Sequence, residues 1–167
     1  VDVLIINPVN SSSAETITDK VVAADIPLVY INREPDESEE QRWADNNWNV
    51  TYVGCDARQS GTYQGELIAD IGLDTLDMNG NGKIDYIMIE GDPENVDAQY
   101  RTEYSVKALE DAGLDVNCLD DQVGNWDQAT AQQLVANSLS QHGNDVEVVF
   151  CNNDAMALGA LQAIESA

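Results

Sequence analysis

The sequence predicts a three-layer α/β/α fold built on a mostly parallel β-sheet. Short apolar segments alternate along the chain with longer segments in which apolar residues recur at helical spacing. The run at residues 3–6 contains only Val, Leu and Ile, as expected of a parallel strand covered by helices on both faces. Regular strand–helix alternation implies right-handed βαβ units, in which consecutive strands lie parallel.

The predicted elements follow in chain order. In the first half, strands are expected at residues 3–6, 28–31 and 52–55, and helices at 13–24 and about 57–71. Two polar segments, residues 33–49 and the Gly-rich residues 74–82, are expected to be loops. In the second half, strands are expected at 84–89, 116–119 and 146–150, and helices at about 96–112, 127–141 and 154–166.

The composition excludes several classes of function. Hydrophobic residues make up 43% of the 167 residues, which is enough for a folded core. The chain carries 31 acidic and 7 basic residues, for a net charge of -24. Nucleic acids and anionic membranes are bound through Lys and Arg, so both are disfavoured as partners. No segment approaches the roughly 20 apolar residues of a membrane-spanning helix.

Residues 77–85 have the pattern of a calcium-binding loop. Oxygen-bearing side chains occupy positions 1, 3, 5 and 9, and Gly occupies position 6, where an EF-hand loop bends sharply. The four side chains are those of Asp77, Asn79, Asn81 and Asp85. Lys83, at position 7, would contribute its backbone carbonyl oxygen.

Position 12 of this loop is Met88, whose side chain cannot bind calcium. The loop alone is therefore incomplete, and a carboxylate from elsewhere in the chain is required. The alternative interpretation is an Asn-Gly turn between a helix and a strand.

Ligands of parallel α/β sheets bind beyond the carboxyl ends of the strands, and the residues at these positions resemble a known family. The chain resembles the periplasmic sugar-binding proteins, in particular the glucose/galactose type, over nearly all of its length. The matching segments are Ile5-Ile6-Asn7, Tyr30 to Pro35, Tyr52 to Asp56, Glu90 to Pro93, Asp97 with Arg101, Trp126-Asp127, and Val146 to Ala157. The last segment is the most specific of these.

The resemblance implies a structural calcium ion and names its missing ligand. In this family a Glu on a distant strand completes the calcium sphere, and the matching residue is Glu147. We therefore expect Glu147 to lie near Asp77 in space. Without the resemblance, Glu147 would be interpreted as a solvent-facing strand residue.

The resemblance also implies a sugar site. Such sites hold a pyranose against aromatic faces and bind its hydroxyls through amides, carboxylates and Arg. The implied residues are Asn7, Asn95, Asp97, Arg101, Trp126 and Asn153. Asn95 replaces the family's His, which leaves the preferred sugar open. Each residue also has a structural alternative: an ion pair for Asp97 and Arg101, helix or turn caps for the Asn residues, and a core position for Trp126.

Compared with the family, the chain is expected to be an interior fragment. Residues 1–32 would be a remnant of the amino-terminal lobe, and residues 33–167 most of the carboxy-terminal lobe, including the calcium loop. A fragment lacking much of one lobe is expected to bind sugar weakly, because two lobes meet around the ligand.

The resemblance implies a non-enzymatic receptor that delivers a monosaccharide to the permease of an ABC transporter, and it leaves a chemoreceptor open as another partner. Its expected location is the periplasm, or the cell surface through a lipid anchor in a Gram-positive bacterium. The main alternative is the ligand-sensing domain of a sugar-responsive transcriptional regulator. An enzyme is disfavoured because no Ser/His/Asp or Cys/His arrangement is visible, and a dockerin-like calcium module because only one incomplete loop is present.

Overall fold

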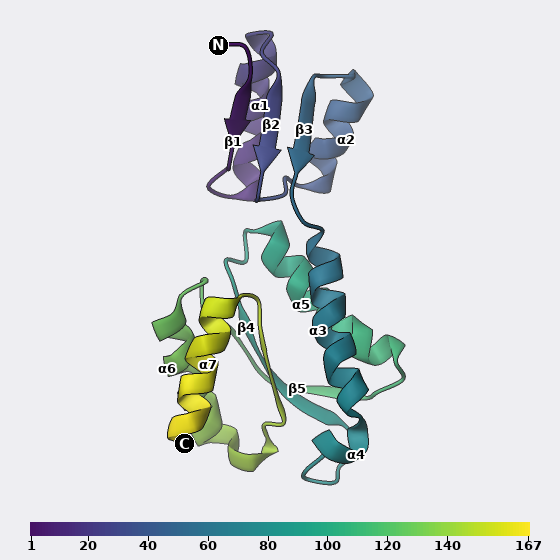
Figure 1. The fold of residues 1–167 in the computed structure, drawn as a ribbon, viewed down its shortest axis with the longest axis vertical. Coiled ribbons are helices and arrows are strands. Elements are labelled where there is room, and N and C mark those ends of the chain that lie inside the picture. The colour runs from purple at the N-terminus through teal and green to yellow at the C-terminus, as the bar shows by residue number, and fades with distance from the viewer. The chain divides into compact units, whose positions relative to one another are not determined.

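The computed structural model describes all 167 residues, which form two compact units (Figure 1). Unit 1 comprises Val1–Asp56 and Glu94–Asp97, and unit 2 comprises Ala57–Pro93 and Ala98–Ala167. Each unit contains a three-stranded parallel sheet packed against helices. The predicted α/β class with parallel strands is confirmed.

Unit 1 contains one three-stranded sheet with helices on one of its faces. Its elements are β1 (Leu4–Ile6), α1 (Ala14–Ala23), β2 (Leu28–Ile31), α2 (Glu37–Asn46) and β3 (Val50–Val53), with a 3₁₀ turn at Ser11–Ser13. The strands pair in the order β1-β2-β3. Leu28, Tyr30 and Trp43 form the centre of the core, where the rings of Tyr30 and Trp43 stack with centroids 5.4 Å apart. The other face of the sheet leaves Ile5 and Val53 exposed.

Helix α2 lies within the segment that the sequence predicts to be a loop. Only Glu39 and Trp43 are buried in this helix, so it shows little apolar periodicity. The carboxylate of Glu39 accepts hydrogen bonds from Trp43 Nε1 at 2.6 Å and from Arg42 Nε at 2.7 Å. Burial opposes the ionisation of Glu39, but these hydrogen bonds outweigh it and lower the pKa of the carboxyl. The prediction failed because a buried Glu replaces the expected apolar residue.

Unit 2 contains the rest of the helices and strands. Its elements are α3 (Ala57–Ile71), α4 (Leu73–Leu76), β4 (Ile84–Glu90), α5 (Val96–Asp111, whose first two residues belong to unit 1), β5 (Val116–Val123), α6 (Gln128–His142), a 3₁₀ turn at Gly143–Asp145, β6 (Val148–Cys151) and α7 (Asp154–Ser166). None of the helices combines the length and the apolar character that a membrane-spanning segment requires.

The sheet of unit 2 is the centre of three layers. Its strands pair in parallel in the order β5-β4-β6. On one face, Ile87 and Ile89 of β4 pack against residues of α6 and α7. On the other face, Tyr86 and Met88 pack against residues of α3, α4 and α5. Strand β4 alternates between these two cores, which is why six of its seven residues are buried.

The division between the units differs from the boundary predicted between residues 32 and 33. Strand β3 pairs with β2 along its whole length, from Leu28↔Val50 to Ile31↔Val53. Residues 33–56 therefore lie in unit 1 with the strands that precede them. The physical reason is helix α2, which lies in the segment predicted to be a loop and returns the chain to the same sheet.

Candidate functional site

The loop at residues 77–85 joins α4 to the amino end of β4. Asp77 organises it: Oδ1 accepts hydrogen bonds from the N–H of Gly80 at 2.7 Å and of Asn81 at 3.0 Å, and Oδ2 accepts one from Gly82 N at 2.8 Å. Gly80 and Gly82 have φ values of 75° and 81°. Glycine adopts this left-handed backbone at little cost, which allows the loop to close around the carboxylate.

Glu147 reaches this loop from the chain segment immediately before β6. Its Oε1 accepts a hydrogen bond from Met78 N at 2.6 Å, and its Oε2 accepts one from Asp85 N at 2.9 Å. In return, Glu147 N donates to the carbonyl of Asp85 at 2.9 Å. The structure thus places Glu147 at the loop, as expected from the resemblance, and the pairing of β6 with β4 holds it there.

Asp85 lies at the centre of the hydrogen bonds of the loop and is only 2% exposed. Its Oδ2 accepts from Asn79 Nδ2 at 2.7 Å and from Asn81 Nδ2 at 2.6 Å. Its Oδ1 accepts from Asn117 Nδ2 at 2.6 Å. Burial alone would raise the pKa of Asp85, but these three donors outweigh it and lower the pKa.

The donor set of the loop fits a hard cation. It consists of oxygen atoms alone: three carboxylates, two side-chain amides and the carbonyl of Lys83, and calcium takes six to eight such ligands. In this structure the carboxylates of Asp77, Asp85 and Glu147 accept hydrogen bonds from N–H groups of the chain. No three or more acidic, His or Cys side chains are arranged closely enough to hold an ion as they stand. That these residues bind an ion, and that the ion is calcium, therefore remain predictions.

Three of the six predicted sugar-site residues meet at the carboxyl ends of the strands of unit 2. Arg101 Nη1 donates to the carbonyl of Asn152 at 2.7 Å, and Asn153 Nδ2 donates to the carbonyl of Trp126 at 3.4 Å. Asn153 Oδ1 also accepts from Met156 N at 2.9 Å, which caps α7. Asn153 therefore fills the structural role that the sequence left open as an alternative.

Two N–H donors in this group are buried and have no acceptor in the chain. They are Nε of Arg101 and Nε1 of Trp126. Trp126 also has a left-handed backbone, with a φ of 66°, and its indole lies against the backbone of Gly91. Unsatisfied buried donors and strained backbone both cost free energy, and both concentrate at binding sites.

The sequence did not single out Asn152 for a role of its own, although it lies among the residues that organise this end of the sheet. Its side chain is 2% exposed, and its Oδ1 accepts a hydrogen bond from Gly91 N at 2.8 Å. Because its carbonyl also accepts from Arg101, Asn152 links the ends of β4 and β6 to α5. The only signal in the sequence is its position two residues after the strand predicted at residues 146–150.

The other three predicted sugar-site residues lie in unit 1. Asn7, after β1, is exposed, and its Oδ1 accepts from Asn32 Nδ2 at 3.5 Å. Asn95 is 2% exposed, and its Oδ1 accepts from Asp97 N at 3.0 Å at the start of α5. Asp97 is also buried. The negative charge of Asp97 also acts on Tyr52: the pKa of Tyr52 is raised, mainly by burial and secondly by this charge. The amide oxygen of Asn95 is thus occupied by the backbone N–H of Asp97, which Asn95 caps at the start of α5.

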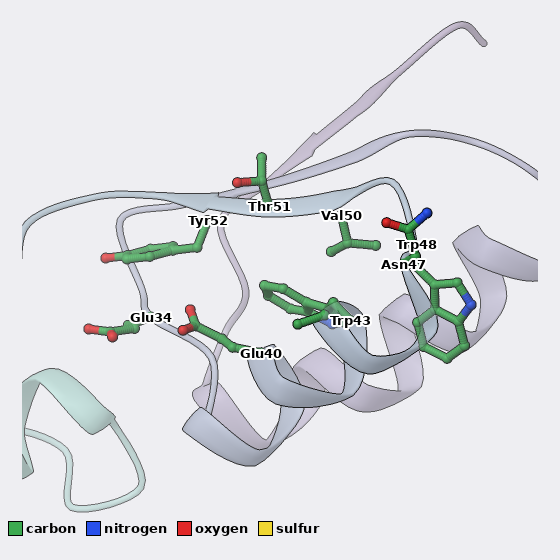
Figure 2. Close-up of a pocket in the computed structure, with 9 residues that line it drawn as sticks. Glu34, Glu40, Trp43, Asn47, Trp48, Val50, Thr51 and Tyr52 are labelled. Carbon is green, nitrogen blue, oxygen red and sulfur yellow. The ribbon is translucent and has the colours of Figure 1, made fainter.

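A pocket of about 380 Å³ lies in unit 1, between α2 and the edge strand β3. Its lining residues are drawn in Figure 2. Tyr52 and Val50 lie on the β3 side, and Glu40 and Trp43 project from α2. The pocket contains none of the predicted sugar-binding or calcium-binding residues. Strand β3 pairs only with β2, so this pocket marks the open edge of the sheet.

The family model of the periplasmic binding protein domain matches residues 1–167. The chain belongs to this family. The D-galactose/methyl-galactoside binding periplasmic protein MglB of Haemophilus influenzae is 38% identical over 173 residues, a match that covers 99% of this chain and 50% of that protein. The D-ribose/D-allose-binding protein of Pseudomonas aeruginosa is 30% identical over 167 residues, covering 100% of this chain and 48% of that protein.

The solved structure of a similar protein has the same fold. The ABC transporter solute binding protein of Bacillus halodurans, with bound myo-inositol, matches 99% of this chain and 52% of its own with a TM-score of 0.81 and 28% identity. The chain spans about half the length of the relatives it matches. These relatives are binding proteins rather than enzymes, and the expected family is confirmed.

Proposed function

We propose that the chain is part of a monosaccharide receptor of the glucose/galactose type that delivers its sugar to an ABC transporter. The similarity to the galactose-binding relative supports the type of ligand. The observation that carries the proposal is the pair of buried donors, Arg101 Nε and Trp126 Nε1, which have no acceptor in the chain. A sugar offers several hydroxyl acceptors to such donors, together with an apolar C–H face for an indole.

The roles of the six residues follow from their contacts. Arg101 and Trp126 would provide donors and the stacking surface. Asp97 would accept from hydroxyls, and the amide of Asn7 would accept from or donate to them. Asn153 has an amide whose oxygen already caps α7, so its contribution would come from Nδ2. Asn95 is engaged at the start of α5 and would act by holding the backbone of Asp97. Hydrogen bonds of this kind discriminate between epimers, because each buried polar group left unpaired costs about 1–3 kcal/mol.

A titration of the ¹⁵N-labelled 167-residue chain with galactose and glucose tests the proposal. We expect the indole N–H resonance of Trp126 to shift and saturate in the millimolar range, because the chain covers half of a two-lobed relative. The indole resonance of Trp48, in unit 1, serves as the internal control, and Arg101→Met should abolish the shift. No shift, or an equal shift with the acyclic mannitol, would contradict the sugar site. Micromolar or tighter affinity would contradict the expected weak binding of this portion of the receptor.

The second part of the proposal is a structural calcium ion held by Asp77, Asn79, Asn81, Asp85, Glu147 and the carbonyl of Lys83. It is supported by the all-oxygen donor set and by the position of Glu147 against the loop. When bound, calcium would balance two of the three negative charges of these carboxylates and so reduce their mutual repulsion. The loop lies at the amino end of β4, whereas Gly91 and the sugar residues of unit 2 follow the carboxyl ends of the strands. The ion would therefore stabilise the unit without touching the sugar.

Calorimetric titration with calcium, and with magnesium in parallel, tests the ion site. We expect one calcium per chain, a higher midpoint of thermal unfolding and a weaker response to magnesium, which demands a more rigid octahedral site. Absence of both heat and stabilisation would refute the site.

The proposed partner is the permease of an ABC transporter, and the proposed location is the periplasm or, with a lipid anchor, the cell surface. Permease and ATPase genes beside the gene for this protein would support both.

A further inference from the structure

Asn117 of β5 is the partner of Asp85 that lies outside the calcium-loop pattern. The parallel pairing of β4 with β5 places Asn117 directly across from Asp85. Its Nδ2 lies 2.6 Å from Asp85 Oδ1, which receives no other hydrogen bond from a side chain of the loop. This contact joins the second strand of the sheet to the loop.

The remaining contacts of Asp85 show what this bond does. The backbone of Asp85 is held from the β6 side, where it exchanges hydrogen bonds with Glu147. Its Oδ2 faces the amides of Asn79 and Asn81 on the loop. The side chain can turn about two torsions, and Asn117 is the group that holds the other oxygen toward β5. The orientation of the carboxylate is therefore set by residues from the loop and from both neighbouring strands.

We propose that Asn117 is a positioning residue of the calcium site, which keeps Asp85 Oδ2 directed toward the loop by binding Oδ1. This inference rests on the calcium site proposed above. A neutral amide suits the task because it donates a hydrogen bond without adding a charge beside the three carboxylates. Residues that orient a metal ligand typically change metal affinity about 10- to 100-fold when they are removed.

A purely structural role would have a different signature. A bond that only strengthens the pairing of β4 with β5 would change the free energy of unfolding without calcium and leave the dissociation constant for calcium unchanged. A positioning role changes the dissociation constant itself. The two quantities are measured separately, by denaturant unfolding in EDTA and by calcium calorimetry on the folded chain.

The test uses the 167-residue chain with Asn117→Val, which keeps a strand-forming residue, and with Asn117→Ala as a second variant should the first fold poorly. Asn137→Ala removes an exposed Asn on α6, far from the loop in sequence, and is the matched control. We expect the Asn117 variants to bind calcium about 10- to 100-fold more weakly and the control to match the unaltered chain. Combined with Asp85→Asn, the loss should not add, because Asn117 acts through Asp85.

The outcomes separate the two proposals. If the unaltered chain binds calcium and both Asn117 variants bind it equally well, the positioning role is overturned and the calcium site stands. Fully additive losses with Asp85→Asn would also overturn it. If the unaltered chain binds no calcium, the site itself fails, and the role of Asn117 fails with it.

Discussion

Replacing Glu147 by Ala tests the link between the distant strand and the loop. In the structure its carboxylate accepts N–H groups from Met78 and Asp85, and Asn79 N lies 3.4 Å from Oε1. The N–H groups of Met78 and Asn79 lie in an exposed part of the loop and can turn to water. Asp85 N is in a half-buried environment, where an unpaired donor is costly.

The size of the effect follows from these contacts. Without calcium, Glu147→Ala should lower the free energy of unfolding by about 2 kcal/mol, the usual net value of a hydrogen bond to a charged group. At a free calcium concentration about 100-fold above the dissociation constant, the ion adds about 2.7 kcal/mol to the unaltered chain. If Glu147 is an essential ligand, the variant loses this contribution too, and the total loss is about 5 kcal/mol.

Urea unfolding followed by circular dichroism, once in EDTA and once in calcium, measures both losses. Glu165→Ala removes an exposed carboxylate near the end of α7 and should behave as the unaltered chain in both buffers. Glu147→Gln keeps one acceptor oxygen, so it should recover part of the stability in EDTA but little of the response to calcium. An equal loss for Glu147→Ala in the two buffers would refute the assignment of Glu147 as a calcium ligand.

Two further predictions concern packing and charge in the separate units. Glu39→Gln should lower the free energy of unfolding by about 2 kcal/mol at neutral pH. Because the folded pKa of Glu39 is lowered, its contribution is present above the unfolded pKa of about 4.5 and is lost as the pH falls through the folded value. The free energies of unfolding of the unaltered chain and of Glu39→Gln, measured in urea, should therefore converge as the pH falls through the folded pKa of Glu39. A difference that stays constant with pH would contradict the hydrogen bonding of an ionised Glu39. Gly91→Ala would place a methyl group into the indole of Trp126, which should cost about 1–3 kcal/mol and move the Trp126 indole resonance. An unchanged resonance would show that the ring does not rest on Gly91.

Much of the fold could be predicted because its signals are local. Strand β2 has the predicted bounds, and α7 agrees with its expected range, since uninterrupted apolar runs and apolar residues at helical spacing are visible in a short window. Helix α2 could not be predicted in this way. Its inner face consists of Trp43 and an ionised Glu39, and a buried carboxylate is recognisable only once the Arg42 and Trp43 donors are in place.

The candidate sites, too, could be predicted only where their sequence signals are local. The proposed ligands on the loop could be named from spacing, because in a loop that wraps an ion every second side chain points inward. Glu147 could be named only from the family resemblance. Asn117 could be named neither from the spacing nor from the resemblance. Its role depends on the register of β5 against β4, which includes a shift between Tyr86 and Ile87 that no local pattern reveals. Asn95 shows the converse, since a residue at a family ligand position is engaged as a cap at the start of α5.

The two candidate sites of unit 2 share the same strands but lie at their opposite ends. Strand β4 has seven residues, so about 20 Å separates the loop from Gly91 at the usual rise per residue. Coupling between the sites would require a part of the unit with two alternative arrangements that both ligands influence. Both faces of β4 are buried in continuous cores, and a packed strand of this kind resists such a change. The free energy of calcium binding should therefore appear in the stability of the unit, while the sugar affinity of the folded chain stays the same with and without the ion.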